Sequence, residues 1–175
     1  MEWLVTAIAL LVAAGVLLSW TAGRVDRLHH RVNGARAELE AQLMHRSGVT
    51  LELAATGLLD PARSLLLLDA AHQARASDQP DRELAESDLS RALVAALGDE
   101  GEVARLREDA AARELLAELG NACRKVELAR RFHNDVVSST LALRGNRVVR
   151  WFGLAGRARL PATVEMDDSW PAALP

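Results

Sequence analysis

The sequence predicts an all-α protein in which an N-terminal transmembrane helix continues into an antiparallel helical bundle of about four helices. Aromatic residues make up only 3% of the chain although 50% of it is hydrophobic, so Leu, Ala and Val must fill the core. Ala and Leu favour helices over strands. Apolar residues recur at steps of three and four, and no run alternates as a strand does. The first twenty residues form one long apolar run, which supplies the membrane part of this prediction.

The N-terminal run "WLVTAIALLVAAGVLLSW" extends from Trp3 to Trp20 without a charge. As a helix it measures roughly 26 Å, close to one hydrocarbon core. A Trp at each end fits the aromatic belts at the two membrane interfaces. A cleaved signal peptide is the alternative, but Glu2 stands where a basic segment should be and the run exceeds a usual signal core. We therefore expect an uncleaved transmembrane anchor over residues 1–23.

Charges beside this anchor predict its orientation. No Lys or Arg precedes the run, whereas Arg24, Arg27, Arg31 and Arg36 follow it closely. Basic residues stay on the cytoplasmic side of a span. We expect a single-pass protein of the cell membrane, with its N-terminus outside and the bundle in the cytoplasm.

Residues 24–145 are expected to form the bundle. The first helix continues from the anchor to about Leu59, and Asp60–Pro61 predicts an N-cap followed by Pro at the first position of a second helix, 61–76. The apolar stripe of the first helix consists of Val25, Leu28, Val32, Ala35, Leu39 and Leu43. A third helix is expected from about Asp81 to Leu97, ended by Gly98 in the way Gly commonly ends helices.

The fourth helix is expected to be long, from about Glu102 to Arg144. Its inward positions are Ala112, Leu115, Leu119, Ala122, Val126, Ala129, His133, Val136, Thr140 and Leu143. This rhythm places His133 on the inward seam of the bundle.

The stretch "ELARRFHNDVVSST" sets His133 beside Asn134 and Asp135 and raises the question of an active site. Successive helical residues diverge by about 100°, so the three side chains cannot converge on one substrate without partners from elsewhere. Nothing near them supplies a nucleophile, and a packed core histidine is the favoured interpretation. We expect no catalytic residue and no enzyme activity. The alternative is a ligand-binding or enzymatic bundle that uses His133 with acids from a neighbouring helix.

No metal or cofactor site is expected. Asp26-x-x-His29 and Asp69-x-x-His72 approach the Glu-x-x-His pattern of helical di-iron sites, but with the wrong acid and no matching second set. The lone Cys123 excludes a multi-cysteine metal site. The chain has no Gly-rich phosphate loop or nucleophile elbow. A net charge of −3 argues against a nucleic-acid partner.

Residues 146–175 are expected to form a basic and aromatic segment followed by a C-terminal tail. Between residues 144 and 160 the sequence holds five Arg and no acid, interleaved with Trp151 and Phe152. This stretch either packs its aromatics across the open end of the bundle or lies on an anionic membrane surface, and the two are compatible. The residues expected at the membrane interface are Trp3, Trp20, Arg24, Arg144, Arg147, Arg150, Trp151, Phe152 and Arg157.

The order of motifs resembles the LemA family of bacterial membrane proteins. The apolar N-terminal run is followed by "RVNGARAELEAQLMHRSG", "AESDLSRAL", "ELARRFHNDVVSS" and "WFGLAG". The matching residues are Gln42, Leu43, Arg46, Glu86, Leu89, Ser90, Ala92, Leu93, Ala129, Arg130, Phe132, Asn134 and Val137. The chain departs from the pattern at His133, where the family usually has Tyr, and it lacks an aromatic near Ala37 and two Pro. The resemblance is to a divergent member, and it implies an anchored antiparallel bundle without implying a reaction.

These observations together favour a membrane-anchored helical bundle that acts as an interaction or scaffold protein. Its expected partners are membrane lipid, including anionic lipid at residues 144–160, and a protein that the sequence does not identify. An exported protein released by signal cleavage is a further alternative.

Overall fold

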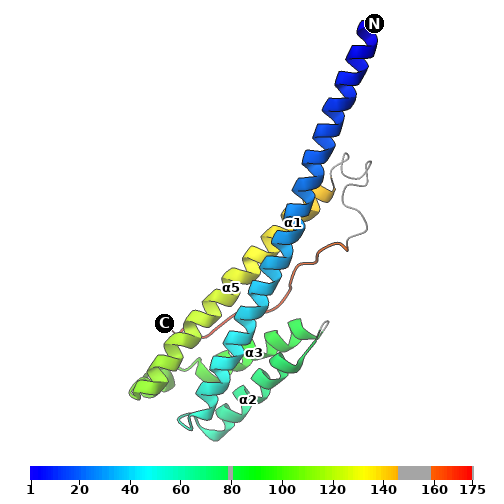
Figure 1. Ribbon diagram of the computed structural model, residues 1–175. Coiled ribbons are helices and arrows are strands. Elements are labelled where there is room, and N and C mark those ends of the chain that lie inside the picture. Colours follow the sequence, from blue (N-terminus) through cyan, green and yellow to red (C-terminus); the bar gives the residue numbers. More distant parts are fainter. Residues whose placement is uncertain (79–80, 146–158, 175) are drawn as a thin grey trace. The chain divides into compact units, whose positions relative to one another are not determined.

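A computed structural model describes residues 1–78, 81–145 and 159–174, apart from the side chains of Ala14, Leu18, Ala22, Val25 and Asp26. Within these ranges all regular secondary structure is helical, which confirms the all-α class. The helices are α1 (Glu2–Ala55), α2 (Pro61–Ala76), α3 (Arg82–Leu97), α4 (Glu100–Leu106) and α5 (Ala110–Arg144). Figure 1 shows α1 as one unbroken helix from the N-terminus.

The chain divides into two compact units, and α1 and α5 each contribute to both. The stalk unit comprises Met1–Arg36 and Phe132–Thr163, and the bundle unit comprises Ala37–Arg131 and Val164–Pro175. The sequence-based boundaries at residues 23 and 145 followed the apolar run and the end of the last helix. The units instead follow packing, so a helix can begin in one and end in the other.

The bundle unit holds the main hydrophobic core. Leucines and alanines from the second half of α1 and from α2, α3, α4 and α5 form one buried cluster. Leu53, Leu67, Leu93 and Leu116 are completely excluded from solvent. Burying a side chain of this size contributes about 1.5–3 kcal/mol, so the cluster is the main source of stability in this unit. The predicted scarcity of aromatic core residues matches what the described bundle contains.

Short local signals mark the start of α2 and the turn after α1. The Asp60 carboxylate accepts hydrogen bonds from the backbone N–H groups of Ala62 and Arg63 at 3.0 and 3.1 Å, and Pro61 follows it as the first helical residue. This confirms the predicted N-cap of α2. Before it, α1 ends at Ala55, and Gly57 adopts a φ of 73° that favours glycine.

The prediction of one continuous last helix from about Glu102 is wrong. Two helices occupy this region, since α4 ends at Leu106 and α5 starts at Ala110. The Asp109 carboxylate accepts a hydrogen bond from Ala112 N at 2.9 Å and so caps the start of α5. Val103, Leu106 and Ala112 are all buried in the same core, so the apolar rhythm continues across the break. Periodicity alone therefore could not reveal it.

Gly98 ends α3 as predicted, but for a different physical reason. Its φ of −74° is right-handed, so the left-handed conformation of glycine is not used. A Cβ at this position would lie 2.5 Å from the Val94 carbonyl oxygen. Close approach to the backbone therefore requires glycine here.

The stalk unit pairs the first part of α1 with the last part of α5. Val32 of α1 packs against Val136 and Val137 of α5. Residues Glu2–Thr21 form a helix that is long and apolar enough to cross a membrane, and none of this stretch is buried within the protein. Figure 1 shows that this end of α1 continues in the same helix as the packed part.

Candidate functional site

The bundle unit contains an ion pair between α1 and α3 that is sealed from solvent. Arg46 of α1 and Glu86 and Ser90 of α3 are exposed by 1% or less. Arg46 Nη2 donates to Glu86 Oε2 at 2.9 Å and to the Glu86 carbonyl oxygen at 3.2 Å, and Nη1 donates to Ser90 Oγ at 3.0 Å. Glu86 and Ser90 are four residues apart, so they share one face of α3 and one guanidinium reaches both.

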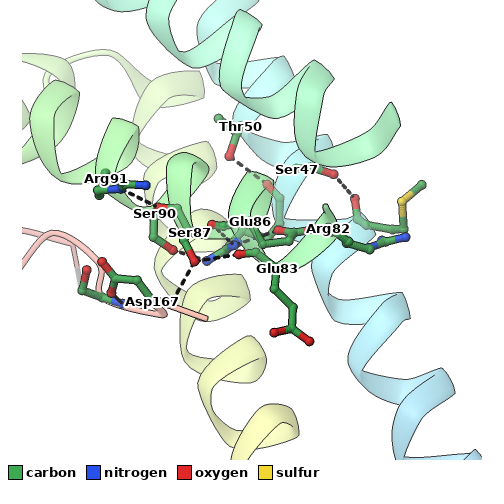
Figure 2. Close-up of polar contacts among 12 residues, drawn as sticks. Ser47, Thr50, Arg82, Glu83, Glu86, Ser87, Ser90, Arg91 and Asp167 are labelled. Carbon is green, nitrogen blue, oxygen red and sulfur yellow. Dashed lines mark hydrogen bonds and ion pairs between the residues drawn. The ribbon is translucent and has the colours of Figure 1, made fainter. Parts of the chain in front are cut away.

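Burial and charge act in opposite directions on the Glu86 carboxyl. Removal from water raises the pKa of Glu86, and Arg46 lowers it through its charge and its hydrogen bond. Arg82 approaches the second carboxylate oxygen, Oε1, at 3.9 Å. Figure 2 shows Glu86, Ser90 and Arg82 together at the centre of this network. The carboxylate is occupied by its partners, so it is suited to fixing the register of α1 against α3 and not to chemistry on a substrate.

A C-terminal strap, residues 164–174, packs along the bundle unit. Val164 and Met166 are buried with Leu39, Leu43 and their α5 neighbours. Asp167 N donates to Ser87 Oγ of α3 at 3.0 Å, a contact drawn in Figure 2. Helical periodicity did not predict this packing of residues 164–174.

Two further contacts join the strap to α5. Arg130 Nε donates to Asp168 Oδ2 at 2.8 Å, and both side chains are about one-fifth exposed. The Arg124 guanidinium lies 5.8 Å from the centre of the Trp170 ring. The signal in the sequence is short: apolar and acidic residues alternate over 164–167, between Pro161 and Pro171. An alternation over four residues is too short to be distinguished from the helical periodicity of the rest of the chain.

His133 is buried on the inward face of α5, as its position in the rhythm predicted. Its Nε2 atom lies 3.3 Å from the carbonyl oxygen of Ala162, within the stalk unit. Asp135 is exposed on another side of the helix. The structure therefore brings His133 against a backbone segment and does not bring it together with Asp135.

The residues expected at the membrane interface are only partly within the described structure. Trp3, Trp20 and Arg24 are exposed on α1. Arg144 is half-buried, with Nη1 3.3 Å from His29 Nε2 of α1 and 3.1 Å from the Arg159 carbonyl oxygen, to which it donates. The end of α5 thus lies beside the middle of the arginine run of α1, at His29. Five expected residues lie outside the described residues: Arg147, Arg150, Trp151, Phe152 and Arg157.

No reactive constellation stands out among the side chains that the structure describes. No group of three His, Cys, Asp or Glu in residues 1–78, 81–145 and 159–174 could hold a metal ion. Cys123 is buried in the bundle core, and this burial raises the pKa of its thiol, which suits a packing role. A groove of about 400 Å³ between α2 and α3 has Asp69, Asp88 and Arg91 in its wall, with no His, Cys or Ser.

Comparison with known proteins adds no relative to these observations. No family model, no curated protein and no solved structure matches the chain. The resemblance to the LemA family stays a prediction.

Proposed function

We propose that this protein is a single-pass membrane-anchored scaffold, whose helical bundle is tethered to a bilayer through the N-terminal segment of α1. One observation carries the proposal. Helix α1 is unbroken over 54 residues, and its first 20 are apolar and unburied whereas its later turns are packed into the bundle. A helix with so much exposed apolar surface needs an apolar environment, and its length matches a hydrocarbon core.

The proposed location is the cell membrane, with the N-terminus outside and the bundle in the cytoplasm. The arginines at 24, 27, 31 and 36 support this orientation because they all follow the apolar segment.

Membership of the LemA family is part of the proposal. Three polar residues that carry the resemblance, Arg46, Glu86 and Ser90, meet in the buried network of the bundle unit. If members of the family all hold α1 and α3 in one register through such a network, this would explain why these three residues belong to the shared motifs. The proposed function is therefore interaction with another protein, without catalysis.

Topology and anchoring can be tested with the full chain in cells. Green fluorescent protein fused after Pro175 should fluoresce, and alkaline phosphatase at the same place should be inactive. The protein should resist extraction from membranes by alkaline carbonate, and N-terminal sequencing should find the residues before Trp20 still present. Active phosphatase would contradict the orientation, and a mature chain that begins after the apolar run would support the exported alternative.

The scaffold role has a separate test. Chemical crosslinking in native membranes followed by purification should recover a protein partner, and a folded His133→Ala variant should recover it equally. A folded His133→Ala variant that loses a biological activity while keeping the partner would favour the alternative of a ligand-binding or enzymatic bundle.

A further inference from the structure

A groove of about 510 Å³ lies in the stalk unit where the apolar segment of α1 ends. Trp20, Arg24, Arg27 and Arg31 line it from α1, and they follow one another at steps of three and four. Residues at this spacing share one face of a helix, so the three guanidinium groups open to the same side. The remaining lining residues are Leu28 of α1 and Ser139 and Leu143 of α5.

These three arginines differ from those of the bundle. Arg24, Arg27 and Arg31 are exposed, and none of them makes a hydrogen bond or an ion pair in the part of the chain that the structure describes. In the bundle unit, by contrast, every arginine between residues 37 and 131 has a hydrogen-bond, ion-pair or cation–π partner. The groove therefore gathers positive charge that the described protein does not neutralise.

Among the side chains that the structure describes, carboxylates lie away from the end of the groove next to the apolar segment. No described Asp or Glu is among the lining residues. The nearest described carboxylate on α5 is Asp135, which lines a separate, smaller groove together with Arg31 and Phe132. Within the described part of the stalk unit, Arg24 and Arg27 beside Trp20 thus carry an excess of positive charge. Like charges gathered on one face repel one another, and a bound anion would relieve that repulsion.

The lining chemistry identifies the anion. Guanidinium groups bind phosphate oxygens with two parallel hydrogen bonds, and the Ser139 hydroxyl is a further donor. Leu28 and Leu143 add an apolar wall, which a free inorganic ion would not use. Trp20 is the residue type that lies at the headgroup level of a bilayer. A molecule with a phosphate and an apolar body fits this combination.

We propose that this groove binds the phosphate headgroup of an anionic phospholipid, with Arg24 and Arg27 as the main phosphate ligands. The inference rests on the proposed membrane anchoring, because the groove meets a bilayer surface only if residues 2–21 span it. Bound lipid would hold residues 20–31 of α1 and the end of α5 together at the membrane surface, as Leu28 and Arg31 face Ser139 and Leu143 across the groove.

The test uses the full-length protein in phosphatidylcholine nanodiscs with and without phosphatidylglycerol. Native mass spectrometry then counts the lipids that stay bound when the protein is released from the nanodiscs. Wild-type protein should retain phosphatidylglycerol in preference to phosphatidylcholine. Ser139→Glu places a negative charge in the groove and leaves all arginines of α1 in place. We expect this variant to lose about fivefold or more of the preference, since each charge near an anionic surface changes binding by about that factor.

Ser138→Glu is the matched control, because Ser138 is an exposed neighbour on α5 that does not line the groove. It should keep the preference for phosphatidylglycerol. A variant with Arg24, Arg27 and Arg31 all changed to Lys keeps the charge but loses the paired hydrogen bonds, and it should show a partial loss.

Failure of the inference and failure of anchoring give different results. Protein that enters nanodiscs but retains both lipids equally, or Ser139→Glu protein that matches Ser138→Glu protein, would overturn the headgroup site and leave the anchor intact. Protein that does not enter nanodiscs would overturn both. A third arm adds inorganic phosphate: displacement of the retained lipid by phosphate alone at equal concentration would assign the groove to the free ion and overturn the lipid assignment.

Discussion

Arg46 and Glu86 form a charged pair, 2.9 Å from Nη2 to Oε2, in a place where neither side chain reaches solvent. They come from α1 and α3, and Ser90 accepts a second hydrogen bond from the same guanidinium at 3.0 Å. Two charges buried in this way are costly to separate, because each would be left without water and without its partner. The pair therefore constrains how the two helices can slide past each other.

Changing Arg46 to Met should destabilise the protein by about 3–5 kcal/mol, because the Glu86 carboxylate would remain buried without its counter-charge. The double variant Arg46→Met with Glu86→Leu should recover most of that loss, since apolar residues of similar volume can replace a buried pair. Urea unfolding of the full chain in detergent, followed by circular dichroism, gives the free energies. Equal losses in the single and double variants would show that packing, and not charge, dominates at this position.

The Glu86 carboxyl should also leave a signature in the dependence of stability on pH. Burial raises its pKa above the ordinary value of 4.5. A group with a raised pKa binds its proton more readily in the folded state, so its contribution to stability is present below the unfolded pKa and is lost as the pH rises through the folded pKa. The unfolding free energy of the wild type should therefore fall, relative to that of Glu86→Gln, as the pH rises from 4.5 through the folded pKa of Glu86. A relative gain over that interval would mean that Arg46 outweighs burial.

The strap should detach when its buried anchor is made charged. Val164 is 3% exposed among apolar neighbours, so Val164→Asp would bury a carboxylate without a counter-charge. We expect limited proteolysis within residues 159–174 to become faster by roughly tenfold or more, because cleavage follows local opening. Leu160→Asp makes the same change at an exposed residue and serves as the control. Similar cleavage rates in both variants would contradict the role of Val164 as an anchor.

His133→Leu should change stability by no more than about 1 kcal/mol. The leucine fits a buried apolar seam, which stabilises the folded state. The substitution also removes the 3.3 Å contact between His133 Nε2 and the Ala162 carbonyl oxygen, which destabilises the folded state. His133→Tyr, which restores the residue usual in the family resembled, should fold as well. Thermal unfolding followed by circular dichroism measures both variants. A loss of several kcal/mol in the leucine variant would mean that the ring nitrogens of His133 hold the stalk unit together.

Local sequence features could predict the helices but not every helix boundary. Composition and the three- and four-residue rhythm account for the all-α class, and Asp60–Pro61 identified the start of α2 because capping depends on residues close in the chain. The uncharged run from Trp3 to Trp20 likewise identified the helix long enough for a membrane. The break between α4 and α5 escaped prediction because the residues on both sides of it face one core.

The sequence by itself determined that this chain is helical, which faces of its helices are apolar and that one segment could cross a membrane. Only the tertiary structure decided which of many similar arginines is buried against Glu86, which ones line a groove beside Trp20 without a partner among the described residues, and where the strap packs. The physical reason is distance along the chain. Periodicity reports the face on which a residue lies, whereas Arg46 is 40 residues from Glu86, and Arg130 is 38 residues from Asp168. Contacts of that kind form only when segments that lie far apart in the chain pack together.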